Sequence, residues 1–252
     1  MTASSSTGSG PTIVLVHGAW ADGSSWLAQV IRLQREGYSA VALPNTQRGL
    51  SKDSAVVRSY LDTIGAPVVL VGHSYGGAVI TNAATGSANV RALVYVDAII
   101  PDEGQVIAQL VGPNSALAAS TTDPTSVFKL VPAPDAPERA PDVYLLPEVV
   151  RTSFANDLTA EQQGAVHATQ RPASLAALAD TSGPPAWKSI RSWALIGTQD
   201  RIIPPPEQRA MATNANAEIV EVDASHVSMI SKPDDVTDLI LTAIAAVTAK
   251  VA

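Results

Sequence analysis

Residues 68–83 read VVLVGHSYGGAVITNA, and this stretch decides how the rest of the chain is interpreted. Four continuous apolar residues at 68–71 predict a strand buried on both faces, and the residues after the glycines predict a helix. Gly72 and Gly76 stand two positions before and two positions after Ser74. On so tight a turn the serine takes an unfavourable backbone angle, and the flanking positions approach too closely for a Cβ. We therefore expect Ser74 to be a nucleophile at the tip of a strand–turn–helix unit.

Short apolar runs of the same kind recur along the chain. They occur at residues 13–16, 40–43, 68–71, 93–96, 193–196 and 219–222. Segments with apolar residues at helical spacing lie between them, and the clearest is a stripe formed by Val236, Leu239, Ile240, Ile244 and Val247. Strands that alternate with helices predict an α/β fold with a mostly parallel sheet flanked by helices.

One stretch, at about 101–188, breaks this alternation. It holds eleven of the eighteen prolines and no convincing buried strand. A gap of this length inside a compact domain is normally a lid or an inserted cap. We therefore expect residues 12–252 to form one domain, with a mostly helical cap inserted after the strand that ends near Asp97. Residues 1–11 are expected to form a flexible N-terminal segment.

Composition narrows the class of protein. The net charge of −7 argues against a nucleic-acid or anionic-membrane partner, and the absence of cysteine excludes disulfides and zinc–thiolate sites. No apolar run approaches the roughly 20 residues that span a bilayer, and nothing at the N-terminus marks a secretory signal. We expect a cytoplasmic protein that acts on a small molecule and needs no metal or organic cofactor; a homodimer stays open.

A serine hydroxyl needs a base before it can act as a nucleophile, and the chain offers four histidines. His226 follows the last predicted strand, at the carboxyl end of the sheet, where the sites of open α/β proteins assemble. His73 adjoins Ser74, so its side chain is expected to point away and to be packed and hydrogen-bonded. His17 belongs to the loop after the first strand, and His167 lies in the predicted cap. We therefore assign His226 as the base.

The base needs a carboxylate that holds its tautomer and stabilises the imidazolium. Asp97 and Asp200 both stand at the ends of predicted strands, and both lie between Ser74 and His226 in the chain. Asp200 follows the strand nearest in sequence to the one before His226, which favours a short reach. Asp97 adjoins the start of the predicted cap, where a carboxylate can equally cap a turn. We favour Asp200 and keep Asp97 as the alternative.

A developing oxyanion needs hydrogen-bond donors that are already aimed at it. One donor is expected to be the backbone N–H of Tyr75, the residue after the nucleophile. The other is expected from the loop after the first strand, which reads HGAW at residues 17–20. We assign this second donor to Ala19, with Trp20 as the near alternative.

Together these stretches resemble the α/β-hydrolase superfamily. The closer likeness is to the branch of plant methyl-ester esterases, salicylate-binding esterases and hydroxynitrile lyases, with its bacterial esterase relatives. The shared stretches are IVLVHGAW at 13–20, VLVGHSYGG at 69–77, GTQDRIIP at 197–204 and ASHVSM at 224–229. The resemblance implies a catalytic triad of Ser74, His226 and Asp200, and an oxyanion hole lined by the amides of Ala19 and Tyr75.

Two positions separate the reactions of this branch. Lyases that resemble this chain carry a threonine after the first-strand histidine and a lysine after the catalytic histidine, where this chain has Gly18 and Val227. Without that hydroxyl and that cation, C–C cleavage loses its electrostatic support, whereas ester hydrolysis needs neither. The resemblance therefore implies a serine esterase that cleaves small carboxylic esters, with Gly18, Trp20 and Val227 as the expected substrate-binding residues.

Two other functions stay open. A cofactor-free perhydrolase or haloperoxidase uses the same triad with peroxide in place of water, and no residue here decides between them. A ligand-binding receptor with slow turnover is a further alternative, although the intact pair of Ser74 and His226 argues against it. A nucleotide-binding loop is not expected, because Gly8 and Gly10 precede a strand instead of following one.

Overall fold

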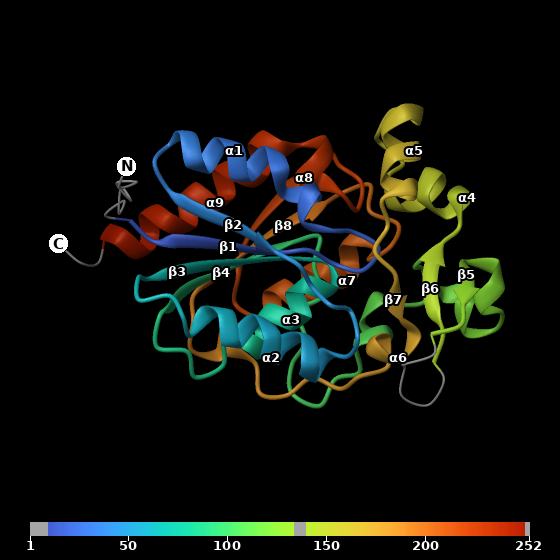
Figure 1. The fold of residues 1–252 in the computed structure, drawn as a ribbon, viewed down its shortest axis with the longest axis horizontal. Coiled ribbons are helices and arrows are strands. Elements are labelled where there is room, and N and C mark those ends of the chain that lie inside the picture. The colour runs from blue at the N-terminus through green and yellow to red at the C-terminus, as the bar shows by residue number, and fades with distance from the viewer. Residues whose placement is uncertain (1–9, 134–139, 250–252) are drawn as a thin grey trace, which may run out of the picture.

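The computed structural model describes residues 10–133 and 140–249, which are built around a six-stranded sheet (Figure 1). The strands are β1 (Thr12–Val16), β2 (Ser39–Leu43), β3 (Val68–His73), β4 (Val90–Val96), β8 (Ser192–Gly197) and β9 (Glu218–Val222). Their order in space is β2-β1-β3-β4-β8-β9, and all of these neighbours are parallel. This confirms the parallel sheet predicted from the six apolar runs. The carboxyl ends of its strands meet at one edge, where the loops after β1, β3, β8 and β9 come together.

Helices cover both faces of the sheet (Figure 1). One face carries α1 (Leu27–Arg35), α8 (Ser228–Ser231) and α9 (Pro233–Thr248), and the other carries α2 (Leu50–Leu61) and α3 (Tyr75–Ala83). The helix α7 (Pro205–Asn214) connects β8 to β9. The apolar stripe predicted for the last helix is buried against the sheet at Val236, Leu239, Ile240 and Ile244. The predicted flanking of the sheet by helices is therefore confirmed.

The residues between β4 and β8 form a separate layer beyond the carboxyl edge of the sheet (Figure 1). This insertion contains α4 (Pro147–Val149), α5 (Ala160–Ala168) and α6 (Leu175–Leu178). It also contains an antiparallel sheet in the order β5-β6-β7, made of β5 (Phe128–Val131), β6 (Asp142–Leu145) and β7 (Ala173–Ser174). Sequence reasoning misses these strands because β5 and β6 have four residues each and are only partly buried, and β7 has only two residues, so none forms a buried run as long as those of the main sheet.

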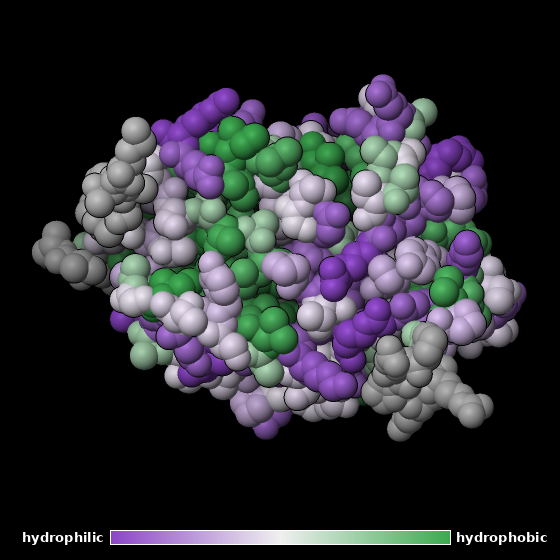
Figure 2. Space-filling view, in the orientation of Figure 1, coloured by the Kyte–Doolittle hydropathy of each residue, from purple (hydrophilic) through white to green (hydrophobic). Residues whose placement is uncertain are grey.

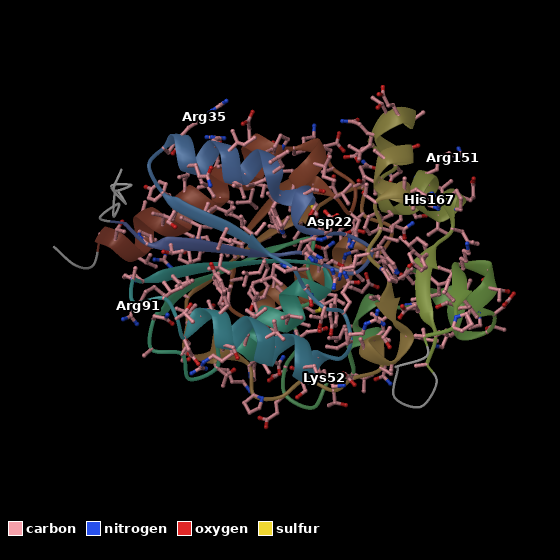
Figure 3. The ribbon with its side chains drawn as sticks, in the orientation of Figure 1. Asp22, Arg35, Lys52, Arg91, Arg151 and His167 are labelled. Carbon is pink, nitrogen blue, oxygen red and sulfur yellow. The ribbon has the colours of Figure 1, made fainter. Side chains whose placement is uncertain are left out.

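The expectations for the N-terminal segment and for a membrane span can be compared only with the described residues. Most of the expected flexible segment at 1–11 lies outside the described residues, which begin at residue 10. Over the ranges that the structure describes, no helix is both long enough and apolar enough to cross a membrane. Charged side chains such as Arg35, Lys52 and Arg91 lie on the outside of the molecule (Figure 3).

Candidate active site

Ser74 occupies the turn between β3 and α3, with a backbone φ of 52° and ψ of −125°. A positive φ is unfavourable for a residue with a side chain, so the surrounding turn must hold Ser74 in this conformation. A Cβ on Gly72 would lie 2.6 Å from the carbonyl oxygen of Gly76, which leaves room only for glycine. This is the close approach expected from the sequence. It presents Ser74 Oγ at the N-terminus of α3, where the helix dipole favours negative charge.

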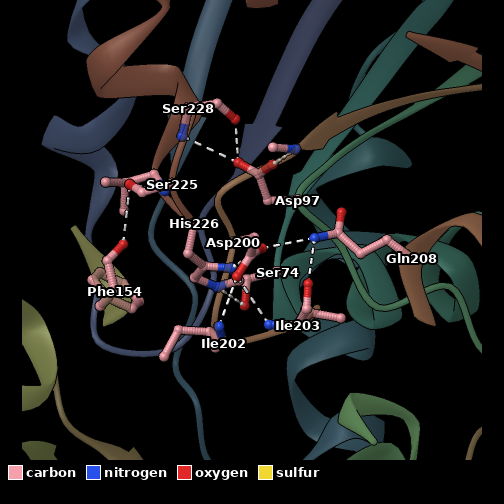
Figure 4. A network of polar contacts seen from close by, with 12 residues as sticks. Ser74, Asp97, Phe154, Asp200, Ile202, Ile203, Gln208, Ser225, His226 and Ser228 are labelled. Carbon is pink, nitrogen blue, oxygen red and sulfur yellow. Dashed lines mark hydrogen bonds and ion pairs between the residues drawn. The ribbon is translucent and has the colours of Figure 1, made fainter. Parts of the chain in front are cut away.

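The loop after β9 brings His226 to this serine (Figure 4). His226 Nε2 lies 2.9 Å from Ser74 Oγ, and His226 Nδ1 lies 2.7 Å from Asp200 Oδ2. The imidazole is fully buried, and burial disfavours its charged form, which lowers the pKa of His226 below its ordinary value. A neutral ring with a carboxylate on Nδ1 has its Nε2 lone pair free to take a proton from a hydroxyl.

Asp200 follows β8 and is held by three N–H donors (Figure 4). Its Oδ1 accepts from the backbone N–H of Ile202 at 2.7 Å and of Ile203 at 3.0 Å, and its Oδ2 accepts from Gln208 Nε2 at 2.7 Å. Burial raises the pKa of Asp200, whereas these three donors favour the ionised carboxylate. The same contacts fix the plane of the carboxylate that faces His226.

The side chain of Asp97, the alternative acid, has different hydrogen-bond partners from that of Asp200. Its Oδ1 accepts the backbone N–H of Gly197 at 2.8 Å, and its Oδ2 accepts the N–H of Ser228 at 3.1 Å and also the Ser228 hydroxyl. Burial, followed by the nearby charge of Asp200, raises the pKa of Asp97. Because Gly197 precedes the Asp200 loop and Ser228 follows His226, Asp97 ties together the two loops that carry them (Figure 4). Among the described residues it makes no hydrogen bond to the His226 ring.

The other histidines are placed as follows. His73 and His17 are both fully buried, and burial lowers the pKa of each ring below its ordinary value. His73 Nε2 donates to the backbone carbonyl of His226 at 2.8 Å, and its Nδ1 accepts the Gly18 N–H at 3.3 Å. His167 lies on α5 in the insertion, away from the main sheet (Figure 3). His73 is packed and hydrogen-bonded as expected, but its bridging of two active-site loops has no signal in the sequence.

The two expected oxyanion donors belong to residues that line the same cavity as Ser74. Tyr75 is the first residue of α3, so its N–H has no acceptor within the helix. The N–H of Trp20 donates to Gln47 Oε1 at 3.4 Å, which engages the alternative donor. Within the described residues no acceptor is found for the N–H of Ala19. The arrangement therefore leaves the Ala19 and Tyr75 amides, and not that of Trp20, free to meet a negative charge near Ser74.

A cavity of about 660 Å³ opens onto the serine. The main domain contributes Ala19, Trp20, Ser74, Tyr75, Ile202 and Ile203, among others, and the insertion contributes Ile107, Val111, Leu117, Phe128, Leu175 and Leu178. Gln109, Ser120 and Thr121 add neutral polar groups. None of the described residues that line the cavity is charged. The site can therefore hold an uncharged, largely apolar molecule beside Ser74.

Of the three expected substrate-binding residues, Trp20 lines this cavity and the other two do not. Gly18 lies against Ser74 and His73, where an added Cβ would be 2.6 Å from Ser74 Cβ. Val227 is buried and lines a second cavity of about 510 Å³, which shares Trp20 with the first. The rim of this second cavity includes Leu27, whose side chain is 58% exposed, and Figure 2 shows hydrophobic residues gathered over α1.

Comparison with known proteins agrees with this fold. The sequence profile of the alpha/beta hydrolase family matches residues 13–239, and the chain belongs to that family. One relative is the carbendazim hydrolyzing esterase of Nocardioides sp. (strain SG-4G), which is 36% identical over 110 residues. The match covers 38% of this chain and 46% of that esterase, so this chain spans less than half of the relative's length.

Solved structures share the architecture over nearly the whole chain. An extracellular alpha/beta-hydrolase from a Paenibacillus species, described as homologous in structure and function to tobacco salicylic acid binding protein 2, has a TM-score of 0.76 at 20% identity. The match covers 92% of this chain and 98% of that one. A methylesterase from Arabidopsis has a TM-score of 0.74 at 19% identity, with coverage of 93% and 99%. These neighbours show that the fold is shared, and the family match confirms the resemblance to the α/β-hydrolase superfamily.

Proposed function

We propose that this protein is a carboxylic ester hydrolase that uses Ser74, His226 and Asp200 as a catalytic triad. The observation that carries the proposal is the continuous contact from Ser74 Oγ through both ring nitrogens of His226 to Asp200 Oδ2. A buried neutral imidazole between a hydroxyl and a carboxylate can activate the hydroxyl as a nucleophile. Membership of the alpha/beta hydrolase family and the esterase relative support the same reaction.

The expected cycle follows from these positions. Ser74 Oγ attacks the ester carbonyl while His226 Nε2 takes the hydroxyl proton. The negative charge that forms on the carbonyl oxygen is stabilised by the N–H groups of Ala19 and Tyr75. His226 then returns the proton to the departing alcohol, which leaves an acyl group on Ser74. Water attacks this acyl-enzyme by the same route and releases the acid.

The cavity supports an uncharged substrate. A charged group placed against its apolar wall would lose its hydration without gaining a partner, which is costly. We therefore infer an ester with an apolar or aromatic acyl part and a small alcohol. Because much of the wall comes from residues 101–188, we also propose that this insertion is a cap that closes the site. The cytoplasmic location and the homodimer stay predictions from the sequence.

The position of Gly18 supports hydrolysis over C–C cleavage. Lyases that resemble this chain carry threonine at the equivalent place, but here an added Cβ would collide with Ser74 Cβ at 2.6 Å and with the His73 carbonyl oxygen at 2.8 Å. No threonine hydroxyl can therefore be presented to a substrate from this position while the loop keeps its path. The ester reaction needs no such hydroxyl.

Ser74→Ala tests the proposal directly. The variant should lower kcat for p-nitrophenyl butyrate by about 10⁴-fold or more, because the members of a triad act as a unit. Wild type should be labelled by a fluorophosphonate at Ser74, as peptide mass spectrometry would show. Retention of more than a tenth of the wild-type rate would reject Ser74 as the nucleophile. Complete labelling without turnover of methyl, aryl or lactone esters would favour a receptor, and peroxide-dependent bromination faster than hydrolysis would favour a perhydrolase.

A further inference from the structure

Gln47 lies in the loop after β2 and has no part in the triad. It is fully buried, and its backbone φ of 57° lies in the left-handed region, which is uncommon for a residue with a side chain. Such a conformation persists only where the surroundings hold it. Gln47 is held in this conformation by hydrogen bonds to segments far away in sequence, and both its side chain and its backbone make such bonds.

The side chain of Gln47 spans the loop that carries Ala19. Its Nε2 donates to the carbonyl oxygen of Gly18 at 3.1 Å and to that of Ala21 at 3.3 Å. Its Oε1 accepts the N–H of Trp20 at 3.4 Å. One amide group is therefore bonded to the backbone on both sides of Ala19, and all three of its bonds reach the loop after β1.

The bond to Gly18 bears directly on the oxyanion donor. The carbonyl of Gly18 and the N–H of Ala19 belong to the same peptide unit, which is planar and trans, so they point in opposite directions. Holding the Gly18 oxygen from behind, where Gln47 Nε2 and His17 Nδ1 both donate to it, aims the Ala19 N–H the other way. Ala19 and Ser74 both line the same cavity, so an N–H that points away from Gln47 can reach a carbonyl bound beside Ser74.

The backbone of Gln47 connects this loop to the insertion. Its carbonyl oxygen accepts the N–H of Ser174, the last residue of β7, at 2.9 Å. The neighbouring Arg48 forms an ion pair with Asp142 of β6, and Trp20 Nε1 donates to the carbonyl oxygen of Val143 on the same strand at 3.1 Å. The β5-β6-β7 sheet therefore contacts the loop after β2 through Gln47 and Arg48. It contacts the loop after β1 through Trp20.

We propose that Gln47 is a positioning residue that aims the Ala19 N–H into the oxyanion hole and couples its direction to the β5-β6-β7 sheet of the insertion. The inference rests on the proposed esterase function. A donor of this kind acts mainly in the transition state, when negative charge has formed on the carbonyl oxygen. Disturbing its direction therefore lowers kcat and leaves KM nearly unchanged.

The test compares Gln47→Glu and Gln47→Leu with wild type. The first keeps the shape and the acceptor for Trp20 N–H but, once ionised, loses both donated bonds; the second loses all three. We expect kcat for p-nitrophenyl butyrate to fall about 10- to 100-fold in each, with KM within about threefold of wild type. Binding of an aryl trifluoromethyl ketone, whose adduct with Ser74 carries an oxyanion, should weaken by the same factor as kcat.

Gln163→Glu is the matched control, because Gln163 also donates two hydrogen bonds to backbone carbonyls but lies on α5, outside the β5-β6-β7 sheet. Its Nε2 donates to the carbonyl oxygen of Arg151 at 3.3 Å and to that of Ala155 at 2.9 Å. This variant should keep the wild-type kcat. If Gln47→Leu fails to fold, Gln47→Glu alone decides. A folded Gln47→Glu with unchanged kcat, or with its whole loss in KM, overturns the inference and leaves the esterase proposal standing. A wild type that neither turns over esters nor is labelled at Ser74 overturns both.

Discussion

His73 donates a hydrogen bond from its ring Nε2 to the backbone carbonyl of His226, at 2.8 Å, across 153 positions of the chain. On its other side, His73 Nδ1 accepts the N–H of Gly18. His73 therefore joins the loop of His226, the proposed base, to the loop of Ala19, the proposed oxyanion donor. Both bonds require a neutral ring with its proton on Nε2, because a protonated ring would place an N–H against the Gly18 N–H.

This requirement predicts a dependence of stability on pH. Burial lowers the pKa of His73 well below its ordinary value of 6.5, so below pH 6.5 the unfolded chain binds a proton that the folded chain does not. The contribution of His73 to the free energy of unfolding is therefore at its full value above pH 6.5. It decreases as the pH falls below 6.5, by about 1.4 kcal/mol per pH unit at most. His73→Asn should remove this contribution.

The measurement is urea unfolding of wild type and His73→Asn between pH 5 and pH 7.5. The other buried titratable groups are present in both proteins, so the difference between the two curves isolates His73. That difference should shrink steadily as the pH falls below 6.5. Parallel curves over the whole range would contradict a ring that is neutral in the folded state and titrates only in the unfolded one.

The two buried aspartates should differ in their effect on turnover. In Asp200→Asn an amide faces His226 Nδ1 and favours the wrong tautomer of the base, so kcat should fall by about 10⁴-fold. In Asp97→Asn the ring keeps its carboxylate partner, and only the support of the Gly197 and Ser228 backbone is weakened, so a loss of about tenfold is expected. Steady-state kinetics at one pH would compare them, and the reverse order would move the triad acid to β4.

The pH dependence of kcat/KM should reflect the burial of His226. From the sequence alone, the acid limb is expected at an ordinary histidine pKa of about 6–7. Burial lowers the pKa of His226, and the base works only as the neutral ring, so activity should be lost only at pH values below that range. Initial rates from pH 4 to pH 9 on an ester stable over that range would show a plateau from about pH 6.5 upward. A limb centred at pH 6 or above would contradict the prediction.

Local patterns and one general property of parallel sheets account for what the sequence predicts. The apolar runs mark all six strands of the main sheet, and the glycines around Ser74 mark its turn. Because parallel strands end at one edge, His226 and Asp200 can be assigned to the same site although 26 positions separate them. Asp200 is favoured over Asp97 in the sequence, and it is the one that contacts the His226 ring.

The features that sequence reasoning misses depend on contacts between distant segments. Gln47 lies in a polar loop that carries no motif, and its role appears only when the loop after β1 is seen folded against it. The strands of the insertion are short, the chain between β5 and β6 is rich in proline, and in the described residues the three strands form a sheet of their own. Gly18 was expected to touch substrate, but the tight packing behind Ser74 places it outside the cavity.

This packing makes Gly18→Ala an informative substitution. The added Cβ would lie 2.6 Å from Ser74 Cβ and 2.8 Å from the His73 carbonyl oxygen, and neither is the flexible end of a side chain. The loop must therefore move, and the Ala19 N–H moves with it because Gly18 Cα belongs to the same planar peptide unit as this N–H. We expect kcat to fall by about 10²- to 10³-fold, the effect of losing one oxyanion donor, together with a lower Tm.

Gly164→Ala is the control for Gly18→Ala. An added Cβ at Gly164 meets nothing within 4 Å, and the residue lies within α5, so the change should raise the free energy of unfolding by about 0.5–1 kcal/mol and leave kcat unchanged. Steady-state kinetics and thermal unfolding would be measured on both variants. Because the same loop carries the Ala19 donor, a Gly18→Ala protein with wild-type kcat would mean that the loop tolerates displacement. In that case the second donor of the proposed oxyanion hole would be assigned to a group other than the Ala19 N–H.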